Sequence, residues 1–302
     1  MLKLMYKDMN FRNEYELELE KCKQHVTQLR RENEELAKTL YELNEKLRDS
    51  EQLKGHFISN VTNEIVNPFT SVLALAANIQ QLKEGDIKQA HHMAGLIFEE
   101  AFHLDFQLKN IFAAALIEAG KEETSNSIVD LHDFTVQLGE YFKSLLSKKK
   151  ITLSINFPGE KNNGESLKFT TDKAKLDLIL KNLISNSIKY SPEDSVVEVS
   201  FVIGNDELRV EVSDHGKGIK PEDRKVIFDR FKQLDEKINS VNTGHGLGLS
   251  IVQAYAEMLG GSVNISDNVN GGTVVQVAIQ QGVDPDDWDD LEGFIIGTET
   301  SY

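Results

Sequence analysis

The sequence predicts an α plus α/β fold, in which long helices are followed by an α/β sandwich. From residue 14 to 50, apolar residues recur in alternating steps of three and four, and two more long helical segments follow. After about residue 128, short alternating strands interleave with helical stretches. We therefore divide the chain into a coiled-coil helix (1–50), a helical hairpin (51–122), an α/β sandwich (128–281) and an acidic tail (282–302).

The composition excludes several classes of partner. The net charge of -16 argues against a nucleic-acid groove or an anionic membrane surface, because both would repel the chain. The single cysteine excludes an internal disulfide framework and indicates a reducing compartment. No segment approaches the roughly 20 apolar residues that span a bilayer. We expect a soluble, cytoplasmic chain, although its start is equally consistent with a cut downstream of a sensor or membrane segment.

The N-terminal helix has the heptad pattern of a parallel, two-stranded coiled coil. With Val26 at position a, Leu29, Leu36 and Leu43 fall at d, and Asn33 is the polar residue at a second a position. A buried asparagine at one a position fixes the register of such a coil. A lone amphipathic helix packed on a domain is the alternative, but the apolar stripe is too narrow for a globular face.

The hairpin follows from the next two helical patterns. The first helix continues to Pro68, which removes a backbone hydrogen bond and favours a kink. Residues 83–86 read as a turn, and residues 87–120 form a second helix that ends at Gly120. Both helices have wide apolar faces, so the sequence predicts a four-helix bundle formed by a homodimer.

The sandwich is predicted from strands whose side chains alternate between apolar and polar. These strands are ITLSINF, VVEVSFVI, LRVEVSD, SVNISDN and GTVVQVAI. Helical stretches at 132–148, 172–189 and 247–259 lie between them. The pattern indicates a sheet with helices covering one face.

Two clusters in the sandwich carry residues suited to a magnesium-triphosphate site. Asn182 and Asn186 lie four apart on one helix face and are followed by Lys189 and Tyr190. A carboxamide oxygen can ligate Mg²⁺ while its NH₂ group donates to phosphate. At the end of a strand, Asp214 could accept a hydrogen bond from an adenine amino group.

Glycines and an aromatic pair complete the pattern. Gly216 and Gly218 allow the backbone after Asp214 to approach a ligand closely. The segment IFDRFKQ places Phe228 ahead of a loop, and TGHGLGLSIV opens a helix whose N-terminal amides could meet phosphate. A last cluster, GGT, ends at Thr273. Each cluster alone is weak, but their joint order and spacing are informative.

In this order the clusters resemble the N, G1, F and G2 boxes of the sensor histidine kinases, whose Bergerat-type ATP fold is shared with the gyrase and Hsp90 families. The resemblance covers about residues 51–281. It implies that Asn186 ligates Mg²⁺, that Asn182 and Lys189 contact phosphates and that Asp214 reads adenine. The other residues implied in ATP binding are Tyr190, Gly216, Gly218, Phe228, Gly244, Gly246, Leu247, Gly248 and Thr273, with Gly244 to Gly248 in a mobile lid.

The same resemblance aligns FISNVTNEIVNPFTSV with the H-box, in which the phospho-accepting histidine is replaced here by Asn63. An imidazole nitrogen can attack a phosphoryl group, whereas the lone pair of an amide nitrogen is delocalised into its carbonyl. Glu64 would normally take the proton of the histidine. Asn67 stands where the family positions water for hydrolysis of a phospho-aspartate, or it satisfies the backbone opened by Pro68; both readings stay open.

These features lead to one main hypothesis and two alternatives. The main one is a homodimeric histidine-kinase core that binds ATP and Mg²⁺ and acts on the receiver domain of a response regulator, with self-phosphorylation impaired by Asn63. Asn63 is either natural or an introduced substitution. The first alternative is an ATP-binding scaffold that modulates another kinase or a regulator. An upstream sensor is a further expected partner. The second, a gyrase-like ATPase or chaperone, is disfavoured because those proteins carry a water-activating glutamate where this chain has Asn182.

Overall fold

The protein forms two compact units, residues 1–59 and 60–302. The computed structural model describes residues 25, 28–45, 48, 65–83, 85–158, 167–204, 206–224, 226–229 and 246–283. In the first unit, residues 28–45 are helical and the side chains of Leu29, Leu36 and Leu43 are exposed. A single chain leaves this apolar seam uncovered, and the coiled coil stays a prediction.

The helices of the hairpin belong to the second unit. Residues 65–80 are helical through Pro68, and the predicted helix over 51–64 lies outside the described residues. The predicted turn is confirmed, because Asp86 N donates to Lys83 O before helix α2 (Ile87–Glu118) begins. In the part of the chain that the structure describes, no helix is both long enough and apolar enough to cross a membrane.

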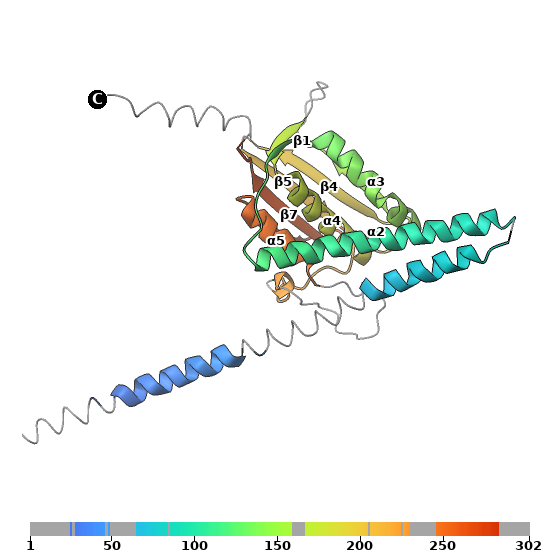
Figure 1. The fold of residues 1–302 in the computed structure, drawn as a ribbon. Coiled ribbons are helices and arrows are strands. Elements are labelled where there is room, and N and C mark those ends of the chain that lie inside the picture. Colours follow the sequence, from blue (N-terminus) through green and yellow to red (C-terminus); the bar gives the residue numbers. More distant parts are fainter. Residues whose placement is uncertain are drawn as a thin grey trace, which may run out of the picture. The chain divides into compact units, whose positions relative to one another are not determined.

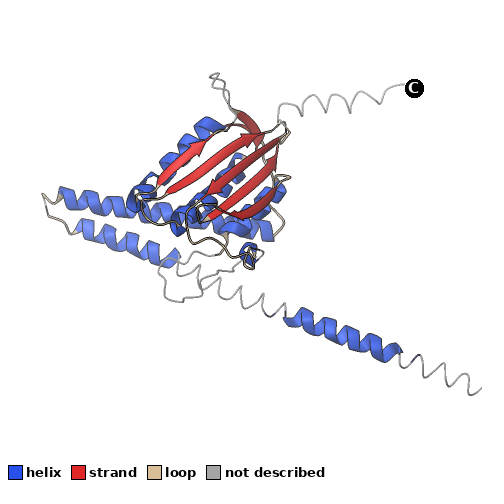
Figure 2. Cartoon of the chain, turned by 180° about the vertical axis from the view of Figure 1, so that it is seen from behind, coloured by secondary structure: helices blue, strands red, loops and turns tan. Residues whose placement is uncertain are grey.

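The sandwich contains a mixed sheet with helices on one face (Figures 1 and 2). Among the described residues the order of the larger sheet is β2-β4-β5-β7-β6, in which β2 and β4 are parallel and the other neighbours antiparallel. Its strands are β2 (Thr152–Asn156), β4 (Val196–Ile203), β5 (Glu207–Ser213), β6 (Ser262–Asp267) and β7 (Thr273–Gln280). The helices are α3 (Leu131–Lys149), α4 (Lys173–Tyr190) and α5 (Gly248–Met258). All of these predicted strands and helices are confirmed.

The core lies between the helices and the sheet. Alternate residues of β4, namely Val197, Val199 and Phe201, are buried, as the period-two pattern of a half-covered sheet requires. From α4, Leu180 and Ile184 are buried as well, and α4 contacts both β4 and β5. Burial of these apolar side chains is the main driving force that holds the helices on the sheet.

Local sequence signals set the ends of the sandwich helices. The carboxylates of Asp130 and Asp172 accept hydrogen bonds from the first free N–H groups of α3 and α4. Helix α3 ends where Lys150 adopts a left-handed conformation with φ of 55°. Just before it, Lys149 Nζ donates to three main-chain carbonyls at the end of α4, those of Ile188, Lys189 and Ser191. This lysine fixes the segment that carries Lys189 and Tyr190.

Two short strands were not predicted. Strands β1 (Ser127–Asp130) and β3 (Lys168–Thr171) pair antiparallel, with Val129 opposite Phe169. Both partner residues are buried. Each strand has only four residues, too few to show a clear alternation in the sequence.

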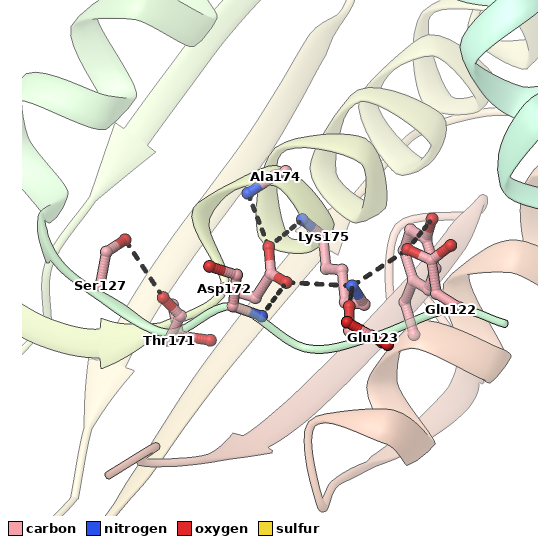
Figure 3. Close-up of polar contacts among 9 residues, drawn as sticks. Glu122, Glu123, Ser127, Thr171, Asp172, Ala174 and Lys175 are labelled. Carbon is pink, nitrogen blue, oxygen red and sulfur yellow. Dashed lines mark hydrogen bonds and ion pairs between the residues drawn. The ribbon is translucent and has the colours of Figure 1, made fainter. Parts of the chain in front are cut away.

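A buried charge cluster ties the segment after α2 to the sandwich (Figure 3). The side chain of Lys175 on α4 forms ion pairs of 3.0 Å with both Glu122 and Asp172, and it donates to the carbonyl of Glu123. Lys175 is only 3% exposed. From α5, Tyr255 Oη donates to Glu122 Oε1 at 3.2 Å. The linker between hairpin and sandwich is therefore held at the start of α4.

Replacing Lys175 with methionine should lower the free energy of unfolding by about 3 kcal/mol, because the buried Asp172 and the partly buried Glu122 would lose their cation. Urea unfolding followed by circular dichroism measures this change. The matched control is Lys143→Met, which removes an exposed ion pair with Glu140 and should cost under about 0.5 kcal/mol. Equal losses in the two variants would contradict the structural role of the cluster.

The same cluster predicts a stability change in acid. Burial acts to raise the pKa of Asp172, but hydrogen bonds from Ser125 and Lys175 and the charge of Lys175 outweigh it and leave this pKa below its ordinary value. Because the folded-state pKa is the lower one, the stabilisation is present at neutral pH and is lost as the pH falls below about 4. Unfolding free energies at stepwise lower pH should therefore decrease more for the parent chain than for Asp172→Asn. Parallel pH profiles would refute this assignment.

Candidate functional site

The carboxylate of Asp214, directly after β5, is fixed by main-chain donors. Its Oδ1 accepts hydrogen bonds from Gly216 N at 2.9 Å and from Thr273 N at 3.1 Å. Its Oδ2 lies 3.4 Å from the hydroxyl of Ser187 on α4. The residue is 7% exposed, so the orientation of Oδ2 is set by groups that the fold holds in place. This geometry suits an acceptor that reads one donor of a ligand.

Close packing around Asp214 depends on two residues that follow β6, Asn268 and Gly272. A Cβ atom on Gly272, whose φ is 107°, would lie 2.1 Å from Asp214 O, so only glycine fits there. Asn268 Nδ2 donates to Asp214 O at 2.8 Å and to Ser213 Oγ at 2.9 Å. Asn268 was not predicted as a site residue, because an asparagine after a strand most often signals a turn.

The loop after β5 also contacts the end of α4. A Cβ atom on Gly216 would lie 2.8 Å from Tyr190 O, and Gly218 has a φ of 72°. The ring of Tyr190 is exposed, and the ammonium groups of Lys189 and Lys217 each lie 5.3 Å from its centroid. Positive charge therefore gathers where the glycine loop meets α4, which favours an anionic ligand.

The two predicted asparagines differ in their surroundings. Asn186 is partly exposed, whereas Asn182 is buried. The Nδ2 group of Asn182 donates to Leu178 O at 2.9 Å and to the Oδ1 of Asn110 on α2 at 2.6 Å. On its other side, a Cβ atom on Gly248 would lie 2.6 Å from Asn182 Oδ1. Asn182 therefore lies directly beneath the first turn of α5.

Helix α5 begins at Gly248 without a side-chain cap on its first turn. The preceding Leu247 is buried, and Gly246 has a φ of 67°. Uncapped N–H groups at a helix start are suitable donors for phosphate oxygens. Phe228 lies on the short helix η1 (Val226–Phe228), which contacts α5.

The remaining predicted site residues either lie outside the described residues or belong to the hairpin. Asn63, Glu64 and Gly244 lie outside the described residues. Asn67 is an exposed residue of the helix at 65–80. The structure thus joins Asp214, Gly216 and Thr273 by hydrogen bonds, and it brings Asn182 to Gly248.

The described residues fit a magnesium nucleotide. Asp214 Oδ2 can accept from a base amino group, and the lysines and the start of α5 suit phosphates. Among the described residues there is no group of three or more His, Cys, Asp or Glu side chains that could hold a metal ion. A Mg²⁺ ion would therefore be held by phosphate oxygens together with a carboxamide such as that of Asn186.

Comparison with known proteins defines the class of this domain. Residues 171–282 match the family described as histidine kinase-, DNA gyrase B-, and HSP90-like ATPase. The structure of full-length ShkA in complex with AMPPNP has a similar fold, with a TM-score of 0.53 and 23% identity. That similarity covers 78% of this chain and 47% of ShkA.

The chain is also similar to curated sensor histidine kinases. The chain is 29% identical over 241 residues to the sensor histidine kinase TmoS of Ectopseudomonas mendocina, which covers 80% of this chain and 24% of TmoS. It is 26% identical over 249 residues to the signal transduction histidine-protein kinase ArlS of Staphylococcus aureus (strain USA300), covering 82% of this chain and 53% of ArlS. The chain is thus similar to sensor histidine kinases over about 80% of its length. It spans less than two thirds of the length of these relatives.

Replacing Asp214 with asparagine should weaken ATP binding about tenfold to hundredfold, as expected for an unsatisfied buried polar group. The amide oxygen can still accept from Gly216 and Thr273, but its NH₂ group then faces the amino group of adenine. Isothermal titration calorimetry measures the change, with the exposed Asp133→Asn as control. Unchanged affinity in Asp214→Asn would refute the site.

Proposed function

We propose that this chain is a two-component kinase core that binds Mg-ATP and acts, as a homodimer, on the receiver domain of a response regulator. We further propose that Asn63 prevents efficient phosphorylation of the chain itself. The observation that carries the proposal is the carboxylate of Asp214, which main-chain donors hold in place, in a chain with asparagine at residue 63. The two parts of the proposal are separable by experiment.

The binding roles follow from the contacts already described. Asp214 Oδ2 accepts from the adenine amino group, because Oδ1 is already engaged by main-chain donors. Lys189 and the first turn of α5 neutralise phosphate charge. The carboxamide of Asn186 would supply an oxygen ligand to Mg²⁺. ATP would supply the phosphoryl group.

The step that the chain is proposed to lack is attack of a nucleophile on the phosphoryl group. Phosphoryl transfer depends mainly on positioning and charge neutralisation, but it still needs a nucleophile. The carboxamide of Asn63 has no nitrogen lone pair free for attack, because resonance delocalises it. Glu64 then has no imidazole proton to accept. Nucleotide binding and phosphate acceptance are thereby separated in one chain.

Two activities toward a receiver domain do not require the histidine. Asn67 carries a carboxamide that can orient water for attack on a phospho-aspartate, and it is exposed on the helix at 65–80. A scaffold that binds a regulator or another kinase in an ATP-dependent way is the second candidate function. The combination of an intact nucleotide site with Asn63 is the observation that favours it.

Dimerisation is supported by apolar surface on both units. Leu36 and Leu43 are exposed along the predicted coiled-coil seam of the first unit. Within the hairpin, Phe69, Leu73 and Phe112 are exposed, which is costly for an isolated chain in water. A second copy of the chain would cover both surfaces, the first as in a coiled coil and the second as in a four-helix bundle.

Replacing Asn63 with histidine should create acid-labile phosphorylation of the chain, whereas the parent chain should show little or none. The imidazole would be the only new group, while Glu64 and the nucleotide site are already present. Incubation with radiolabelled ATP, followed by acid and base treatment, measures the label. Asn63→Gln is the matched control, because it changes the side chain without adding a nucleophile.

Two results would contradict this proposal. Strong histidine phosphorylation of the parent chain would mean that another residue accepts the phosphoryl group. An unlabelled Asn63→His variant that still binds ATP would mean that the hairpin no longer reaches the nucleotide site, which favours the scaffold.

A further inference from the structure

A buried hydrogen bond joins the hairpin to the nucleotide-binding helix. Asn110 on α2 and Asn182 on α4 are each 4% exposed. The Nδ2 group of Asn182 donates to Asn110 Oδ1 at 2.6 Å. A side chain of the hairpin is therefore bonded directly to a residue implied in contacting phosphates.

The orientation of both amides is fixed by their own helices. Asn110 Nδ2 donates to Phe106 O at 3.1 Å, so Asn110 presents its oxygen to Asn182. Asn182 Nδ2 also donates to Leu178 O at 2.9 Å. A carboxamide nitrogen carries only two hydrogens, and Asn182 uses both. Its oxygen lies against the backbone of Gly248 at the start of α5.

Helix α2 has other contacts with the sandwich that do not involve Asn182. The ring of Phe102 on α2 packs against the ring of Tyr141 on α3, with the ring centroids 4.3 Å apart. Glu99 accepts from Ser144 at 3.0 Å and forms an ion pair with Lys148. These contacts link α2 to α3 at positions of α2 other than Asn110. Substitutions can therefore disrupt them without changing Asn110.

These contacts place two acceptors in competition for one N–H group. The inference rests on the proposed function. For Asn182 to donate to a phosphate oxygen, it must lose its hydrogen bond to either Leu178 or Asn110. The bond to Leu178 lies within α4 itself, whereas the bond to Asn110 can be lost by a shift of α2 alone. We propose that Asn110 is a positioning residue, through which the hairpin holds Asn182 back and lowers the affinity for the nucleotide phosphates.

The test removes the acceptor and compares ligands with and without phosphates. Asn110→Leu keeps the number and branching of the side-chain heavy atoms but cannot accept a hydrogen bond, so Asn182 should be free to bind phosphate. Calorimetry on the full chain with Mg²⁺ should show ATP affinity raised about threefold to tenfold, the range expected for one net hydrogen bond. Adenosine affinity should not change, because the base is bound at Asp214. A merely structural effect would alter both ligands.

Two further variants define the cause. In an Asn182→Ala background, Asn110→Leu should no longer raise ATP affinity, since the competing donor is gone. The matched control is Glu99→Ala, which loosens α2 on α3 without touching Asn182, and it should leave ATP affinity unchanged. If Asn110→Leu unfolds at a lower temperature, Asn110→Ala removes the same acceptor without adding branched volume and should give the same selective gain for ATP.

The outcomes separate this inference from the proposed function. No binding of ATP or adenosine by the parent chain would refute the function itself and the inference with it. ATP binding that is the same in the parent chain, Asn110→Leu and Asn110→Ala would overturn the inference alone. An equal rise in Glu99→Ala would assign the effect to docking of α2 in general and would also overturn the role of Asn110.

Discussion

The candidate site depends on the way the main chain holds the carboxylate of Asp214. Donors from Gly216 and Thr273 reach the same oxygen, although they come from the ends of two neighbouring strands. Gly272 then packs so closely on Asp214 that no other residue fits. These contacts fix the second carboxylate oxygen near α4. All the binding roles proposed for the nucleotide assume this position of Asp214 Oδ2. A change in the sheet register at β5 or β7 would displace it.

In the proposed function, the chain separates nucleotide binding from phosphate acceptance. The proposed nucleotide site would use main-chain donors and cations of the sandwich, none of which depends on residue 63. The acceptor step depends on one nitrogen lone pair in the hairpin, which an amide does not offer. The two parts remain joined by buried contacts, those of Lys175 with Glu122 and of Asn182 with Asn110. These contacts are the basis of the proposed effect of α2 on nucleotide binding.

The sequence predicted those parts of the fold whose patterns are local. Strand β4 was predicted with its observed bounds, because its eight residues alternate clearly. The four-residue strands β1 and β3 were missed, since pairing of Val129 with Phe169 depends on residues far apart in the chain. Asp214, Gly216 and Thr273 were predicted as site residues from the order of the clusters. The bond between Asn110 and Asn182 was not, because 72 positions separate them and a buried asparagine has no distinct sequence signal.

The most direct test is a crystal structure of the full chain with Mg²⁺ and a non-hydrolysable ATP analogue. The account predicts that the adenine amino group donates to Asp214 Oδ2 while Oδ1 keeps its two main-chain donors. It also predicts that Asn182 donates to a phosphate oxygen and has left Asn110. A nucleotide whose base does not contact Asp214 would contradict the central claim.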